Sequence, residues 1–190
     1  AGRTPDLLVH DKVKTFDTQL RVYEEITAAS ATLEDPKTAA REIKRVLDAV
    51  QREKRPGYLE IPRDMAWADI GEAEAWASVG PQRDQAALAE AMQEIAMRFN
   101  RSRNPVVLAG IDIMRLDLRD QVIRFAERYN LPVATSFMGK AVFPEHHPNF
   151  IGTYMGAASH PYARHMVERS DCLLMLGVWL TDTETGRFTS

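Results

Sequence analysis

The sequence predicts an α/β fold with a parallel sheet, chiefly because of residues 104–136. An apolar run at residues 105–109 is closed by Gly110, and a second apolar run occupies residues 131–135. About a dozen residues of helical period separate the two runs. Parallel strands cannot be joined by a tight turn and need a longer crossover, which is usually a helix. The segment therefore predicts two parallel strands connected by a helix.

A third apolar run, residues 171–177, extends this pattern towards the end of the sequence. Residues 139–156 are rich in Gly and Pro and predict a loop. A helix is expected to begin at His160-Pro161, because proline is well suited to the first helical position. The order strand, helix, strand, loop, helix, strand is typical of a Rossmann-like sheet.

Two earlier helices are marked by aspartates that can cap their first turns. Asp84 predicts a helix to about Phe99, and Asp35 before Pro36 predicts another that ends at Pro56-Gly57. The apolar stripes expected to pack are Ala39, Ile43, Val46, Leu47 and Val50 in the Asp35 helix, and Leu88, Met92, Ile95 and Phe99 in the Asp84 helix.

The first part of the chain contains weaker signals. Residues 7–9 predict a short strand, Asp17 or Thr18 can begin a helix to about Ser30, and residues 58–61 predict another strand. Residues 66–82 lack a sustained period and predict a surface linker, held to one domain by Trp67 and Trp76. The domains expected are therefore residues 1–65 and 83–190, with residues 66–82 between them.

Charge and cysteine content exclude several classes of function. A net charge of −3 and a pI near 6.0 give no electrostatic reason to bind nucleic acid or an anionic membrane. The longest apolar stretch, residues 172–180, is well short of the roughly 20 residues that a membrane helix needs. The single cysteine, Cys172, lies in that stretch and is interpreted as a buried thiol in a reducing, cytoplasmic compartment.

Several motifs resemble binding or metal sites, but a structural role is the preferred interpretation of each. Gly110 ends a strand, yet the second and third glycines of the dinucleotide fingerprint are missing, so a tight turn is the preferred explanation. His146 and His147 are adjacent, so their side chains should point apart, and a solvated loop is the preferred interpretation of this pair. His160 and His165 are five residues apart and miss the spacing of a shared metal on a helix.

Polar residues that follow the predicted strands are candidates for binding, because parallel sheets bind ligands at the carboxyl ends of their strands. They are Lys140, Asp182 and Glu184, and a polar loop with capping residues is the alternative. His10 and Asp11 form the most interesting pair. A histidine at a strand end can transfer protons near neutral pH, and a neighbouring carboxylate can tune it.

Two blocks of sequence carry a resemblance to a known family. Residues 54–64, Lys-Arg-Pro-Gly-Tyr-Leu-Glu-Ile-Pro-Arg-Asp, resemble the end of the pyrimidine-binding domain of thiamine diphosphate-dependent enzymes. Residues 139–148, which begin Gly-Lys and end Phe-Pro-Glu-His-His-Pro, resemble the family's central domain. The fold implied is therefore a partial pyrimidine-binding domain followed by an incomplete Rossmann-like central domain. Within the family, residues 176–182 and 186–189 are most similar to 2-oxo acid decarboxylases of the pyruvate and indolepyruvate type.

The resemblance implies a lyase that uses thiamine diphosphate and Mg²⁺ to decarboxylate a 2-oxo acid, and a homo-oligomer. In decarboxylases of this type two adjacent histidines follow the strand that corresponds to residues 7–9 and face the active site. His10 matches the first and Asp11 stands where the second would be, while a shifted alignment would pair Val9 with His10. The activating glutamate and the diphosphate and magnesium motif of the family are expected outside this sequence. We therefore expect an inactive fragment of a longer polypeptide.

Three alternatives remain open from the sequence. An acetolactate synthase-like carboligase shares the framework of the decarboxylases. A second alternative is a non-catalytic module whose Rossmann-like half binds a nucleotide or a flavin. The third makes the central domain a scaffold for subunit assembly.

Overall fold

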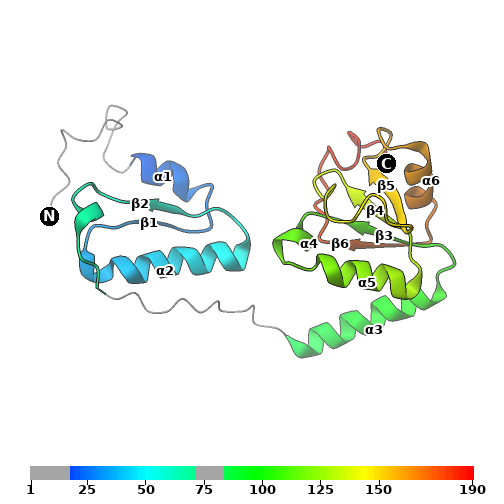
Figure 1. The fold of residues 1–190 in the computed structure, drawn as a ribbon, viewed down its shortest axis with the longest axis horizontal. Helices are drawn as coiled ribbons and strands as arrows, with labels where there is room; N and C mark the ends of the chain where they lie inside the picture. Colours follow the sequence, from blue (N-terminus) through cyan, green and yellow to red (C-terminus); the bar gives the residue numbers. More distant parts are fainter. Residues whose placement is uncertain (1–17, 72–83) are drawn as a thin grey trace. The chain divides into compact units, whose positions relative to one another are not determined.

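The computed structural model describes residues 18–71 and 84–190 of the chain. Internal contacts divide the chain into two units, Ala1–Arg83 and Asp84–Ser190, and each unit is described by itself. Both contain parallel strands and helices, so the α/β class predicted from the sequence is confirmed (Figure 1).

The second unit is built on a four-stranded parallel sheet in the order β5-β4-β3-β6. Its strands are β3 (Pro105–Ala109), β4 (Val133–Ser136), β5 (Phe150–Tyr154) and β6 (Cys172–Leu176). Val107 of β3 lies opposite Val133 of β4 on one side and Leu174 of β6 on the other. The predicted parallel pairing of the two strands in residues 104–136 is therefore confirmed.

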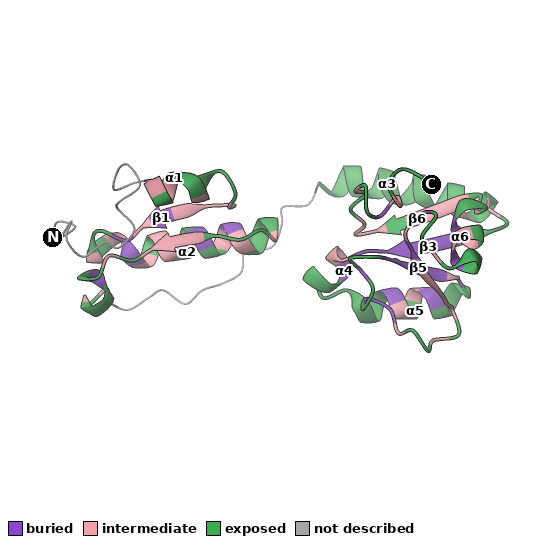
Figure 2. Ribbon diagram, turned by 90° about the horizontal axis from the view of Figure 1, so that it is seen from above, coloured by how far each residue is buried: buried purple, intermediate pink, exposed green. Residues whose placement is uncertain are grey.

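Alternate residues of β3 supply the two faces of this sheet, as the two-residue period of a strand requires. Val107 and Ala109 pack with Val122 and Ala126 of α5 (Arg119–Tyr129). Val106 and Leu108 belong to the core on the opposite face, with Val167 of α6 (Pro161–Glu168). Helices thus cover both faces, and burial is concentrated in the central strands (Figure 2).

A short helix, α4 (Asp112–Arg115), follows β3, and α3 (Gln85–Arg101) precedes it. The predicted cap of α3 is confirmed, since the Asp84 carboxylate accepts hydrogen bonds from the Ala86 and Ala87 N–H groups at 3.0 Å. The predicted packing of its apolar stripe is wrong for most of its length. Phe99 packs against the core, whereas three residues of the stripe are exposed: Leu88, Met92 and Ile95.

In its described residues, 18–71, the first unit contains two parallel strands, β1 (Ser30–Thr32) and β2 (Tyr58–Glu60). Between them runs α2 (Pro36–Glu53), and the Asp35 carboxylate accepts a hydrogen bond from the Lys37 N–H at 3.0 Å, as predicted for its cap. The first helix, α1 (Thr18–Glu24), stacks Tyr23 on Tyr58 with ring centroids 4.2 Å apart. A 3-10 turn, η2 (Met65–Trp67), follows β2.

Several details differ from the sequence predictions. The helix expected to reach Ser30 ends at Glu24, because the chain must extend to pair β1 with β2. The loop expected at residues 139–156 contains the strand β5. Cys172 is half-buried rather than fully buried, because β6 pairs only with β3 among the described strands and lies at the edge of the sheet.

The prediction that Trp67 holds the linker to one domain is wrong. Trp67 is 91% exposed and does not anchor the chain, whereas Trp76 lies outside the described residues. No helix among residues 18–71 and 84–190 is long and apolar enough to cross a membrane.

Candidate functional site

The predicted catalytic pair, His10 and Asp11, lies outside the residues that the structure describes, as does the strand predicted at residues 7–9. Its role stays a prediction. Parallel sheets bind ligands at the carboxyl ends of their strands. Within the described residues, the loops at this edge of the second unit's sheet are therefore the first place to look for a binding site.

The loops that follow β3 and β6 pack backbone against backbone. A Cβ atom added at Gly110 would lie 2.1 Å from the carbonyl oxygen of Gly177 and 2.5 Å from the Cα atom of Val178. Gly139, in the loop after β4, is similarly close, since its Cβ atom would lie 2.7 Å from the Ala109 carbonyl oxygen. Glycine at these positions is therefore explained by close packing of the loops.

This packing also occupies the N–H groups that a nucleotide would need. The Gly110 N–H donates to the Leu176 carbonyl at 2.8 Å, and the Asp112 N–H donates to the Gly177 carbonyl at 3.2 Å. Dinucleotide-binding loops instead direct free N–H groups at the pyrophosphate. The geometry favours the tight-turn interpretation of Gly110 over a phosphate site.

Glu184 is a buried carboxylate that joins two of these loops. It is 2% exposed, accepts a hydrogen bond from the Met138 N–H at 3.2 Å, and is bonded by the Thr181 hydroxyl. Because the Glu184 carboxylate is already bonded to protein groups, the polar-loop interpretation of this residue is favoured over a ligand-binding role. Asp182 is exposed and accepts from the Thr183 N–H at 2.9 Å, and Lys140 is exposed 4.0 Å from Glu145.

A second cluster at this edge was not identified from the sequence. The indole N–H of Trp179 donates to Asp112 at 2.7 Å, and Arg115 donates to the same carboxylate at 3.0 Å. The Arg115 guanidinium carbon also lies 5.5 Å from the centroid of the Trp179 ring. Asp112 and Trp179 are far apart in the sequence, and only the parallel pairing of β3 with β6 brings them together.

Two of the histidines, His147 and His160, make local structural contacts. His146 is exposed, but the predicted solvated loop is wrong for His147, whose side chain is 13% exposed and packs edge-on against Phe143. His147 Nε2 lies 3.3 Å from Glu127, and Nδ1 accepts from the Asn149 N–H. His160 caps α6 by accepting from the Tyr162 N–H at 3.3 Å.

The ionisable side chains of the described residues do not gather into a metal-ligand cluster. Within residues 18–71 and 84–190, no three His, Cys, Asp or Glu side chains converge as metal ligands. The carboxylates of Asp112 and Glu184 already accept hydrogen bonds from protein groups.

The geometry described above is that of a doubly covered parallel sheet whose carboxyl-edge loops pack on one another. Residues 92–190, just over half of the chain, match the family model described as thiamine pyrophosphate enzyme, central domain. The chain belongs to the thiamine pyrophosphate enzyme family, as the sequence resemblance implied.

Related proteins extend the similarity across both units. The chain is 38% identical over 180 residues to an indole-3-pyruvate decarboxylase of Azospirillum brasilense, covering 93% of this chain and 32% of that protein. It is 28% identical over 195 residues to pyruvate decarboxylase isozyme 2 of Saccharomyces cerevisiae, covering 100% of this chain and 34% of that protein. An alpha-keto-acid decarboxylase of Mycobacterium tuberculosis is 33% identical over 174 residues, which are 92% of this chain and 31% of that protein. The chain thus spans about a third of the length of these relatives.

Proposed function

We propose that this chain is part of a thiamine diphosphate- and Mg²⁺-dependent lyase that decarboxylates a 2-oxo acid of the indolepyruvate or pyruvate type. The observation that supports this most directly is the 38% identity to an indole-3-pyruvate decarboxylase, which extends over nearly the whole chain. When bound, the cofactor supplies the carbanion that attacks the substrate carbonyl, and the protein contributes orientation and proton transfer.

In this proposal the two parts of the chain have different roles. Residues 1–65 are the end of a pyrimidine-binding domain and contribute His10, with Asp11 beside it, as the proton-transfer group. Residues 83–190 are a framework, because the Gly110 N–H and the Glu184 carboxylate at their carboxyl edge are bonded within the protein. The 190 residues alone are inactive, and the whole protein is a cytoplasmic homo-oligomer.

The test uses the longer polypeptide encoded by the flanking reading frame. We expect it to release carbon dioxide from indolepyruvate or pyruvate only when thiamine diphosphate and Mg²⁺ are both present. Absence of turnover of any 2-oxo acid under these conditions would refute the decarboxylase proposal. Formation of a condensed acetohydroxy acid without release of aldehyde would instead identify the carboligase alternative.

The role of His10 is tested in the same polypeptide with a matched control. His10→Gln is expected to lower kcat by about 10²-fold or more, the usual contribution of a positioned proton-transfer group. His146→Gln changes an exposed loop histidine and should leave kcat unchanged. An equal effect of the two substitutions would exclude a specific role for His10.

The flavin and scaffold alternatives have their own measurements. A yellow, fluorescent flavin that copurifies with the protein would support the ligand-binding module, although the bonded N–H groups at Gly110 and Asp112 do not favour it. A monomer by light scattering would contradict the assembly role of the central domain.

A further inference from the structure

A cavity of about 480 Å³ lies at the amino-terminal edge of the second unit's sheet, opposite the carboxyl-edge loops. It is bounded by the turn before β3, the turn between α5 and β4, and the last turn of α6. Cavities of this size are typical of sites for small organic molecules. The residues that line it are Arg103, Asn104, Pro105, Val106, Tyr129, Asn130, Leu131, Pro132, His165, Met166 and Arg169.

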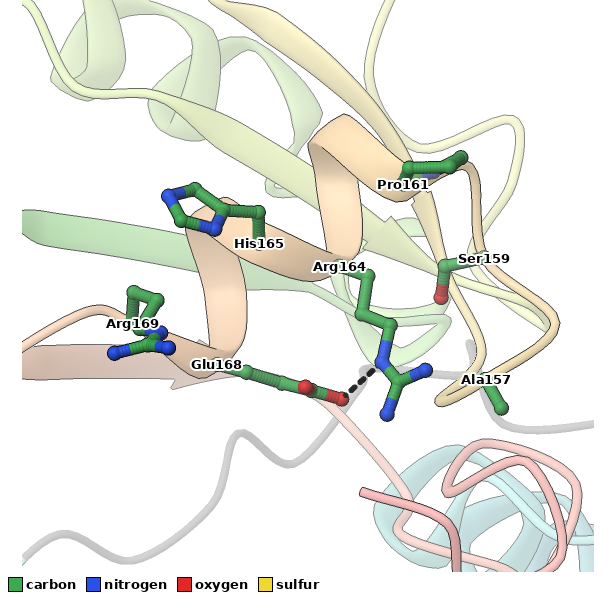
Figure 3. Close-up of a pocket in the computed structure, with 7 residues that line it drawn as sticks. All are labelled: Ala157, Ser159, Pro161, Arg164, His165, Glu168 and Arg169. Atoms are coloured by element: carbon green, nitrogen blue, oxygen red, sulfur yellow. Dashed lines mark hydrogen bonds and ion pairs between the residues drawn. The ribbon is translucent and has the colours of Figure 1, made fainter.

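The charged side chains at this cavity are positive. Arg103 and Arg169 line it together with the imidazole of His165, and no carboxylate is among the lining residues. His165 of α6 and Arg169, which caps the carboxyl end of this helix, are four residues apart and therefore lie on the same side of it. Figure 3 shows them on that side, while Arg164 and Glu168 pair at 2.9 Å along the adjoining cavity.

The guanidinium groups of Arg103 and Arg169 are available to bind a ligand. Neither Arg103 nor Arg169 forms a side-chain ion pair or hydrogen bond with any residue in the described part of the chain. The nearby carboxylates are otherwise engaged: Glu168 binds Arg164 and accepts from the Tyr154 hydroxyl, and Asp171 accepts from backbone N–H groups. An uncompensated pair of guanidinium groups favours an anion.

Long-range hydrogen bonds hold two walls of the cavity in place. Asp171 accepts from the Arg103 N–H at 2.8 Å and the Asn104 N–H at 2.9 Å, which fixes the turn before β3. Asn149 donates to the Leu131 carbonyl at 2.9 Å and to the Asn130 side chain at 3.4 Å, which fixes the turn before β4. A cavity with fixed walls loses little entropy when a ligand binds.

The remaining surface of the cavity is apolar. Val106 and Leu131 are buried in the core and present little surface, but Pro132 and Met166 are half-buried and Tyr129 at the end of α5 is exposed. A small inorganic anion would leave the apolar surface of these three residues in contact with water. We infer that this cavity binds an organic anion, with a carboxylate held by Arg103 and Arg169 and an aromatic or aliphatic body against Tyr129, Pro132 and Met166. The inference does not depend on the proposed catalytic function, because it concerns binding alone.

The experiment measures binding of 3-phenylpropanoate to the purified chain by calorimetry, with neutral 3-phenylpropanamide and inorganic phosphate as comparison probes. We expect the carboxylate to bind at least tenfold more tightly than either. Arg103→Gln and Arg169→Gln should each weaken binding about tenfold, as loss of a charged hydrogen bond does. Arg119→Gln removes an exposed arginine at the other end of α5 and should change nothing.

Amide chemical shifts in ¹⁵N spectra provide a second measurement, because they locate the bound molecule. Saturable shifts at Arg103, Leu131 and Arg169 are expected, without shifts at Gly110. Three results would overturn the inference: no binding of the carboxylate at millimolar concentration, equal binding of the amide, or equal binding of phosphate. Shifts confined to another part of the chain would also overturn it.

Discussion

Gly110→Ala tests whether close packing of the carboxyl-edge loops holds the central sheet together. The added methyl group would lie 2.1 Å from the Gly177 carbonyl oxygen and 2.5 Å from the Val178 Cα atom. Both neighbours are backbone atoms and cannot rotate away, so the loops after β3 and β6 must separate. The separation lengthens two hydrogen bonds, from the Gly110 N–H to Leu176 and from the Asp112 N–H to Gly177.

The expected loss of stability follows from these contacts. Overpacking costs about 1–3 kcal/mol, and each weakened hydrogen bond costs about 1 kcal/mol, which gives roughly 3–5 kcal/mol in total. That is a large part of the roughly 5–15 kcal/mol that stabilises a typical domain. With a denaturant dependence of about 2 kcal/mol per molar, the urea midpoint of the second unit should fall by about 2 M.

Urea unfolding and hydrogen exchange of the fully buried Val107 and Val133 amides measure this loss in the second unit. Gly71→Ala is the control, because no atom lies within 4 Å of its added methyl group and Gly71 belongs to the first unit. Its positive φ costs about 1 kcal/mol there and should leave exchange at Val107 unchanged. An unchanged midpoint for Gly110→Ala would refute the packing explanation of this glycine.

Three further predictions follow from hydrogen bonds described above. Asp35→Ala removes the cap of α2 and should lower the unfolding free energy of the first unit by about 1 kcal/mol, measured by urea unfolding. Hydrogen bonds from the Ser102 hydroxyl and the Arg103 and Asn104 N–H groups lower the pKa of Asp171 to about 2. Its stabilising effect is therefore complete above its unfolded pKa and is lost as pH falls from about 4 to 2; Asp171→Asn should show a smaller decrease in urea midpoint over that range. Glu184→Ala should speed hydrogen exchange at the Met138 amide and leave the Ala126 amide protected; equal protection of Met138 in both proteins would contradict its role in joining the loops.

The central part of the fold could be predicted because its signals are local. The apolar runs that form β3, β4 and β6 and the caps at Asp35 and Asp84 each lie within a few residues, and the structure confirms them. The strand β5 was missed because Gly152 interrupts it and flanking prolines are typical of loops. The strand β1 was missed because three residues of small side chains carry no period, and pairing with β2 alone defines them.

The candidate site was harder to predict for a different reason. The hydrogen bond from the Trp179 indole to Asp112 and the one from the Met138 N–H to Glu184 each join residues far apart in the sequence. No spacing rule connects such residues before the strand order is known. The packing of Leu88 and Met92 was predicted wrongly because helical periodicity identifies an apolar side without identifying what covers it.

The strand order has a consequence for how the second unit folds. Among the described strands of this sheet β3 is the earliest in the sequence, yet it lies between two others, and one of its neighbours, β6, comes after both β4 and β5. During synthesis β4 can pair with β3 early, while the opposite edge of β3 stays uncovered until about 60 further residues have followed. Contacts between residues so distant in sequence form slowly. The interval leaves the backbone N–H and C=O groups along this edge of β3 unpaired, and such an edge can pair with a strand of another chain.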